Sequence, residues 1–157
     1  MSVWRHVRAI GLCPAVVTLV VPLIIVWTSG AGLADWALAV PGALLIALGL
    51  ALVAWTVGLF ATEGEGTLAP WDPTQRLVIR GPYRYVRNPM IGGVLVVLLG
   101  EAALFGSLAL VTWFVAVLVV NALYIPLVEE AGLRRRFGAE YDAYCAAVPR
   151  WLPRVLS

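Results

Sequence analysis

Long apolar runs separated by short polar intervals dominate the chain. The three runs cover residues 9–27, 36–60 and 90–128. As helices at about 1.5 Å per residue, each of the first two runs is long enough to cross a hydrocarbon layer of about 30 Å once. The third run holds thirty-nine residues, or about 58 Å of helix, close to twice that thickness. We therefore predict four membrane helices, of which the last two form a hairpin that turns near residues 105–107.

Composition indicates the same class of protein. Of the 157 residues, 62% are hydrophobic and 13% are charged, whereas an ordinary soluble domain has roughly half and a quarter. This composition excludes a disordered chain, a basic nucleic-acid-binding domain and a disulfide-stapled secreted module. We expect one all-α membrane domain over residues 1–157. Residues 1–60 would hold two membrane helices, and residues 61–157 a polar loop, the hairpin and a tail.

The arginines predict the orientation of this domain. All eleven basic residues are arginines, and they lie before residue 9, in the polar interval 61–89 and in the C-terminal tail. Basic segments stay cytoplasmic, so both termini and the polar interval should face the cytoplasm in a multi-pass protein of the cell membrane. For residues 9–27, a cleaved signal peptide is the competing interpretation, because Arg5 and Arg8 precede the run and small residues follow it.

Two adjacent acids at the end of the third apolar run are the strongest sign of chemistry. Glu129 and Glu130 bear desolvation and mutual repulsion there, so a cationic partner would stabilise them. The alternative for Glu130 is a solvated i,i+4 pair with Arg134 on a continuing helix. Arg84 and Arg87 would share a helix face at the membrane surface, although they could merely fix the topology.

Several single residues need an interpretation of their own. Glu101 is an acid inside an apolar run, which is functional by default, but it lies near the hairpin tip, and we expect it to snorkel or to cap the turn. Cys13 and Cys145 should lie at different depths and stay free thiols. His6 has no Cys or His cluster near it, so no metal site is expected.

Other residues predict packing. Small residues at four-residue spacing let two helices approach closely in lipid. In the second run, Ala43, Ala47 and Ala51 have this spacing, as do Ala54 and Gly58, and we interpret this stripe as a packing face. Tyr141 and Tyr144 share a face of a tail helix that would cover the cytoplasmic end of the bundle. They would serve there as anchors or as pocket walls.

The polar interval and the tail contain motifs in a specific order. Residues 75–90 include a Gly-Pro-Tyr turn and an Arg-Asn-Pro stretch; beyond the hairpin come Glu129-Glu130, a Phe-Gly-x-x-Tyr-x-x-Tyr motif at residues 137–144 and Val-Pro-Arg at residues 148–150. Over roughly residues 67–153, the chain resembles the isoprenylcysteine carboxyl methyltransferase and phospholipid methyltransferase family of integral membrane methyltransferases. The resemblance implies that the cytoplasmic loop and tail close over a pocket for S-adenosylmethionine.

The resemblance also implies which residues bind this cofactor: Gln75, Arg76, Leu77, Val78, Tyr83, Arg87, Asn88, Pro89, Met90, Glu129 and Glu130. The methionine carboxylate would meet Arg87 or the amides of residues 87–90 at a helix N-terminus. The glutamates would face the amino group or the ribose hydroxyls. Arg87 and Glu130 are the expected catalytic residues, and catalysis would rest on alignment and exclusion of water.

The chain departs from the family pattern beside these residues. The family's Arg-His-Pro-x-Tyr reads Arg87-Asn88-Pro89-Met90-Ile91 here, and Asn88 cannot act as a base near neutral pH. The arginine that precedes the glutamates in eukaryotic carboxyl methyltransferases is also absent. Both departures argue against a prenylcysteine carboxylate as the acceptor.

We therefore predict an S-adenosylmethionine-dependent methyltransferase whose acceptor is a lipophilic molecule or lipid arriving from the bilayer. The methyl group would go to a carboxylate, an amine or a hydroxyl, and no nucleic acid takes part. Two alternatives stay open. One is a four-helix proton-coupled transporter that uses Glu101. The other is a scaffold that keeps the methyltransferase fold without catalysis.

Overall fold

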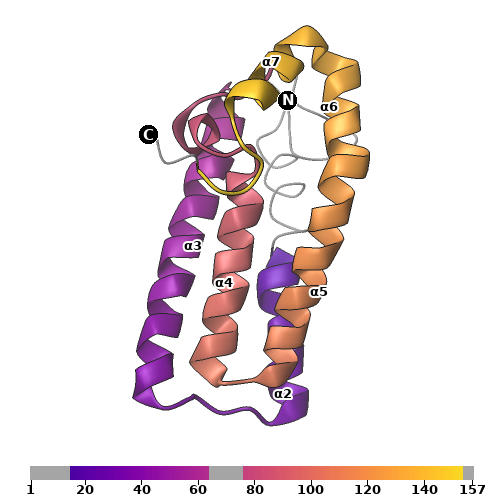
Figure 1. The fold of residues 1–157 in the computed structure, drawn as a ribbon. Helices are drawn as coiled ribbons and strands as arrows, with labels where there is room; N and C mark the ends of the chain where they lie inside the picture. The colour runs from indigo at the N-terminus through magenta and orange to yellow at the C-terminus, as the bar shows by residue number, and fades with distance from the viewer. Residues whose placement is uncertain (1–14, 64–75, 154–157) are drawn as a thin grey trace.

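The computed structural model describes residues 15–63 and 76–153, in which all regular structure is helical, as predicted. Cys13 and Gln75 lie outside the described residues, and Cys145 is a free thiol. In chain order the elements are η1 (Val16–Val20, a π turn), α2 (Val21–Ser29), α3 (Trp36–Glu63), η2 (Gly81–Arg84, a 3-10 turn), α4 (Pro89–Phe105), α5 (Leu108–Tyr124), η3 (Ile125–Glu129, a π turn), α6 (Glu130–Phe137) and α7 (Ala139–Ala147). Figure 1 shows them as an elongated bundle with α7 at one end.

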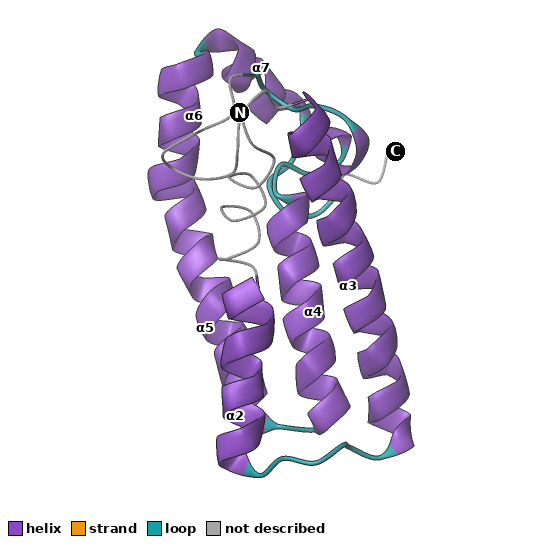
Figure 2. Cartoon of the chain, turned by 180° about the vertical axis from the view of Figure 1, so that it is seen from behind, coloured by secondary structure: helices purple, strands orange, loops and turns teal. Residues whose placement is uncertain are grey.

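The predicted hairpin is present and turns where expected. α4 ends at Phe105, and Gly106 adopts a left-handed conformation with φ of 54°. The amides of Gly106 and Ser107 donate to the carbonyls of Ala103 and Ala102, so the last turn of α4 is capped by its own chain reversal. Figure 2 shows this turn at the same end of the bundle as the connection between α2 and α3.

α3 and α4 touch through their backbones. A Cβ on Gly49 would lie 2.7 Å from the carbonyl oxygen of Gly93, and one on Gly42 would lie 2.6 Å from the amide nitrogen of Leu104. The predicted small-residue stripe is wrong, because its members Ala43, Ala47, Ala51, Ala54 and Gly58 are all exposed. The contact uses Gly42 and Gly49, seven residues apart, instead, since glycine leaves room for backbone contact.

This contact predicts an asymmetric effect of two alanine substitutions in one helix. Gly49→Ala forces a methyl group against backbone atoms, so we expect it to destabilise the fold by about 1–3 kcal/mol. Gly58→Ala should be neutral or slightly stabilising, because nothing lies within 4 Å of its Cβ position and alanine favours helix. Thermal unfolding in detergent measures both. Equal unfolding midpoints for the two variants would contradict the contact.

The first helix belongs to the bundle. The indole Nε1 of Trp113 on α5 donates to the carbonyl of Val17 at 3.1 Å. Val17 and Trp113 also pack against a buried cluster of Val94, Leu98 and Val117. These contacts favour a resident helix over a cleaved signal peptide for this part of the chain.

Two helices, Trp36–Phe60 and Leu108–Phe137, are long and apolar enough to cross a membrane, and Val16–Ser29 and Pro89–Phe105 are shorter apolar helices. Large hydrophobic side chains cover the outside of the bundle, as at Leu48 and Leu127. Such a surface is unfavourable in water and stable in lipid. The helices are therefore those of a membrane protein.

Glu101 does not reach the bundle surface. Its side chain is buried, and Oε2 has no hydrogen-bond partner among the described residues. The turn amides of Gly106 and Ser107 bind carbonyl groups of α4, so Glu101 caps neither of them. The expectation of snorkelling or capping is wrong, because the side chain lies on the inward face of α4 with Leu98 and Ala102.

Candidate functional site

Charged residues gather at one end of the bundle, where the loop before α4 meets α6 and α7 (Figure 1). The described arginines all belong to segments at this end: Arg76, Arg80, Arg84, Arg87, Arg134, Arg135, Arg136 and Arg150. At the opposite end lie Trp27 and Trp36, whose side chains are exposed. The bundle therefore has one basic end and one end with exposed tryptophans.

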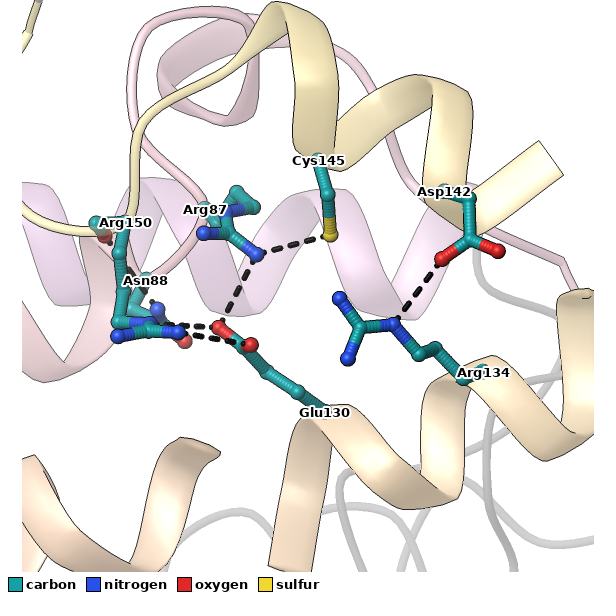
Figure 3. A network of polar contacts seen from close by, with 7 residues as sticks. All are labelled: Arg87, Asn88, Glu130, Arg134, Asp142, Cys145 and Arg150. Carbon is teal, nitrogen blue, oxygen red and sulfur yellow. Dashed lines mark hydrogen bonds and ion pairs between the residues drawn. The ribbon is translucent and has the colours of Figure 1, made fainter. Parts of the chain in front are cut away.

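A buried ion-pair cluster forms the centre of the basic end (Figure 3). Glu130 is 4% exposed. Its Oε1 accepts from Nε of Arg150 at 2.7 Å and lies 3.0 Å from Nη1 of Arg87, while Oε2 accepts from Nη2 of Arg150 at 2.9 Å. Arg150 thus holds the carboxylate with two parallel hydrogen bonds, the strong arrangement for this pair. The cations that Glu130 was expected to need are arginines of the chain itself.

These cations set the protonation of Glu130, which lies beyond the apolar run that ends at residue 128. Burial acts to raise its pKa. The hydrogen bond from Arg150 and the charges of Arg87, Arg150 and Arg134 outweigh burial, so the pKa of Glu130 lies below its usual value. The alternative i,i+4 pair is not the main contact, because Arg134 binds Asp142 of α7 through Nε at 3.0 Å. Glu130 is therefore a buried, ionised carboxylate.

The tail is tied to the loop before α4 by four further hydrogen bonds. The amide of Arg87 donates to the carbonyl of Pro149 at 2.9 Å, and its Nη1 to Sγ of Cys145 at 2.8 Å. Nδ2 of Asn88 donates to the carbonyl of Arg150 at 3.3 Å, and the Tyr144 hydroxyl to the carbonyl of Tyr83 at 2.7 Å. Asn88, at the position of the family histidine, therefore fastens the tail.

Buried aromatic rings support this junction. Tyr141, Tyr144 and Val148 form a small core against which Leu77 packs, and the Tyr83 ring meets Phe60 of α3 edge-on at 5.3 Å between centroids. Tyr141 and Tyr144 are 2% and 6% exposed, so both are packed inside this small core. Burial raises the pKa of the Tyr144 hydroxyl, which is therefore a neutral hydrogen-bond donor.

Two polar groups at the site are left without partners among the described residues. Glu129 is exposed and makes no ion pair with them. Its carboxylate lies near Tyr83, whose pKa is raised mainly by burial and further by its neighbours Tyr144 and Glu129. Nε of Arg87 is buried and has no acceptor in the part of the chain that the structure describes. An anion and a cation held together in one ligand would satisfy both groups.

The structure brings together part of the predicted set. Tyr83, Arg87, Asn88 and Glu130 meet at the junction of loop and tail, and Pro89 lies fully buried at the start of α4. The remaining predicted residues differ in exposure: Val78 is buried, Leu77 and Met90 are partly buried, and Arg76 is exposed. Of the amides of residues 87–90, Arg87 uses its own on Pro149 and proline has none. Only those of Asn88 and Met90 remain for an anion.

Sequence reasoning assigned no role to Arg150 or to Cys145. Arg150 makes the closest contacts to Glu130, and Cys145 accepts a hydrogen bond from Arg87. The signal for Arg150 was present, because Val-Pro-Arg closes the tail motif and a buried glutamate needs cations. For Cys145 the sequence carried no signal, since its contact depends on how α7 folds back.

The comparison with protein families bears directly on this site. A model of the phospholipid methyltransferase family matches residues 37–140, about two thirds of the chain. The chain belongs to the phospholipid methyltransferase family. No curated protein and no solved structure gives a match. The family is one of membrane methyltransferases, so membership implies methyl transfer as the general activity.

The matched range refines the resemblance drawn from motifs. The family match begins at residue 37 and not near residue 67, so α3 belongs to the phospholipid methyltransferase core. This agrees with the backbone contact between α3 and α4 and with the packing of Phe60 on Tyr83. The match ends at residue 140, before Tyr144, Cys145 and Arg150. The tail that completes the ion-pair cluster thus lies outside the matched range.

Proposed function

We propose that the protein is an S-adenosylmethionine-dependent methyltransferase that acts on a lipophilic acceptor at the cytoplasmic face of the cell membrane. One observation carries the proposal within a chain of this family. An exposed acid, Glu129, lies near Tyr83. At the same junction of loop and tail, Nε of Arg87 is a buried N–H donor that has no acceptor among the described residues. The amino acid part of S-adenosylmethionine offers both an ammonium group and a carboxylate.

The described residues fit this cofactor with separate roles. Glu129 would accept hydrogen bonds from the ammonium group, and Arg87 Nε, with the amides of Asn88 and Met90, would meet the carboxylate. Tyr83, Leu77, Val78 and Arg76 would line the remainder of the pocket. Both oxygens of Glu130 are taken by arginines, so Glu130 would act by holding Arg87 in place.

Methyl transfer would need little acid or base catalysis from the protein. When bound, S-adenosylmethionine would supply an electrophilic methyl group to a lone pair of the acceptor, with the sulfur as the leaving group. A carboxylate acceptor has no proton to lose, whereas an amine or a hydroxyl loses one. The side chains would contribute alignment and exclusion of water. The use of the Asn88 amide to hold the tail is consistent with this role.

We also propose four membrane crossings with both termini in the cytoplasm. The seventeen residues of α4 span about 26 Å, close to one hydrocarbon thickness. The thirty residues of Leu108–Phe137 reach about 45 Å, so residues beyond 128, with the arginines of α6, would project into the cytoplasm. The exposed Trp27 and Trp36 at the other end suit the outer interface.

Calorimetric titration of S-adenosylmethionine into detergent-purified protein tests the cofactor. The wild type should bind saturably. Glu129→Gln should lower the affinity about 10- to 100-fold, because a hydrogen bond to a charged group is worth roughly 1.5–3 kcal/mol. Glu140→Gln is the matched control on an exposed acid of α7 and should bind like the wild type. Absence of binding at millimolar ligand to folded protein would refute the proposal.

Proton-coupled transport is a second candidate, favoured by the buried carboxyl of Glu101 and its Oε2 without a hydrogen-bond partner among the described residues. It gives no account of the ion-pair cluster or of the family match. Glu101→Gln distinguishes the two functions. It should leave S-adenosylmethionine binding unchanged in a methyltransferase and abolish activity in a transporter. The inactive scaffold would bind no cofactor in the titration above or would bind it without methyl transfer.

A further inference from the structure

The helix that carries the two glutamates changes its hydrogen-bond pattern directly before them. The amide of Ile125 donates to the carbonyl of Asn121, four residues back, whereas the amide of Glu130 donates to Ile125, five residues back. η3 is therefore a π turn, which holds one residue more than a turn of α-helix. Pro126 is the second residue of this turn. Because proline has no N–H and clashes with the carbonyl four residues back, it disfavours a regular α-helix here.

The extra residue changes which glutamate faces inward. Along α5 the inward face passes through Val117 and Ile125, which are buried, and Asn121 between them, which is partly buried, at a spacing of four. In a regular α-helix the next position at that spacing is Glu129. The structure instead has Glu129 exposed and Glu130 buried. Five residues of α-helix rotate the chain by about 500°, or 140° past a full turn, so Ile125 and Glu130 share a face only because of the π turn.

We propose that the π turn at residues 125–129, favoured by Pro126, is a positioning element. It places Glu130 beside Arg87 and Arg150 and leaves Glu129 exposed toward the proposed cofactor pocket. Without the extra residue, the chain beyond it would be turned by about 100°, and Glu129 would take the inward place. The choice of ion-pair partner stands on the geometry alone. The assignment of Glu129 to the cofactor rests on the proposed function.

Two variants of the turn test this role with the same proline change. Pro126→Ala combined with deletion of Leu127, an exposed residue, removes the extra residue and keeps Glu130 four positions after Ile125. Pro126→Ala combined with insertion of one alanine after Leu127 moves Glu130 to six positions after Ile125, about 240° around a regular helix. We expect the deletion variant to unfold within a few degrees of wild type and the insertion variant about 5–15 °C lower.

The coupling between Arg150 and Glu130 distinguishes a positioning role of the turn from a merely structural one. In each background, thermal midpoints of Arg150→Gln, of Glu130→Gln and of the double variant give the coupling between the two side chains. We expect coupling in the wild type and in the deletion variant and none in the insertion variant. The proposal would be overturned if the deletion variant lost the coupling between Arg150 and Glu130, or if the insertion variant kept it.

Point substitutions keep the test decisive if a length variant fails to fold. In the full-length chain, Glu130→Gln should lower the unfolding midpoint by about 5–15 °C, and Glu129→Gln should change it by at most a few degrees. Equal decreases in the unfolding midpoint of the two variants would overturn the proposal that Glu130, and not Glu129, pairs with the arginines. All these measurements are made without cofactor, so they stand or fall independently of the titration that tests the proposed function.

Discussion

Replacing Glu130 with glutamine should release the C-terminal tail from the bundle. The substitution leaves the Arg87 guanidinium, whose side chain is 12% exposed, without its counter-charge and removes the paired hydrogen bonds to Arg150. Breaking a buried ion pair on one side costs about 3–5 kcal/mol; we expect about 2–4 kcal/mol, since Arg150 is about one-third exposed and glutamine still accepts a hydrogen bond. Hydrogen exchange of residues 139–150 should speed up more than exchange within α3.

Acid provides the control for this prediction. The pKa of Glu130 lies below its ordinary value of 4.5, so its contribution to stability is complete above that value and is lost as the pH falls through the lower, folded-state pKa. The difference in unfolding midpoint between wild type and Glu130→Gln should therefore be constant from about pH 8 to pH 5 and shrink below pH 4.5. A difference that persists at the lowest pH would show that lost packing, and not lost charge, destabilises the variant.

The sequence predicted the helical hairpin and the polar end because these follow from local signals. The length of the third apolar run predicted the hairpin, and Gly106 indicated the position of its turn. The packing face of α3 could not be predicted in this way, because Gly42 and Gly49 differ from the neighbouring alanines only when a second helix is present. The stripe of alanines has a better four-residue repeat, but it faces outward. Spacing shows that small residues share a face and does not show which face meets a neighbour.

The sequence indicated two residues of the ion-pair cluster, Arg87 and Glu130, and did not indicate how they pair. Adjacent acids at a helix end indicated a need for cations, and the motif order placed Arg87 in the same region. Which glutamate meets which arginine depends on the π turn and on the path of residues 148–150 back over the loop. A helical wheel with a regular period would have turned Glu129 inward. One extra residue in one turn reverses that assignment, and Pro126 was the only local sign of it.

Replacing Arg87 with lysine should weaken S-adenosylmethionine binding about 10- to 100-fold, one of the largest effects we expect. Lysine keeps a positive charge near Glu130 but lacks the Nε–H that is buried without an acceptor among the described residues. A hydrogen bond from a cation to the methionine carboxylate is worth roughly 1.5–3 kcal/mol, and lysine cannot reproduce the planar arrangement of arginine donors. Arg84→Lys, three residues earlier and exposed, should bind like wild type.

A change in the ligand separates this contact from a general disturbance of the site. Decarboxylated S-adenosylmethionine retains the ammonium, sulfonium and adenine groups and lacks only the carboxylate. Because it offers Arg87 Nε no acceptor, its affinity should be the same for wild type and Arg87→Lys. For the wild type it should lie at least about 10- to 100-fold below that of S-adenosylmethionine, since the amides of Asn88 and Met90 lose their acceptor too. If the lysine variant binds both ligands more weakly by the same factor, Arg87 acts through the Glu130 cluster and not on the carboxylate.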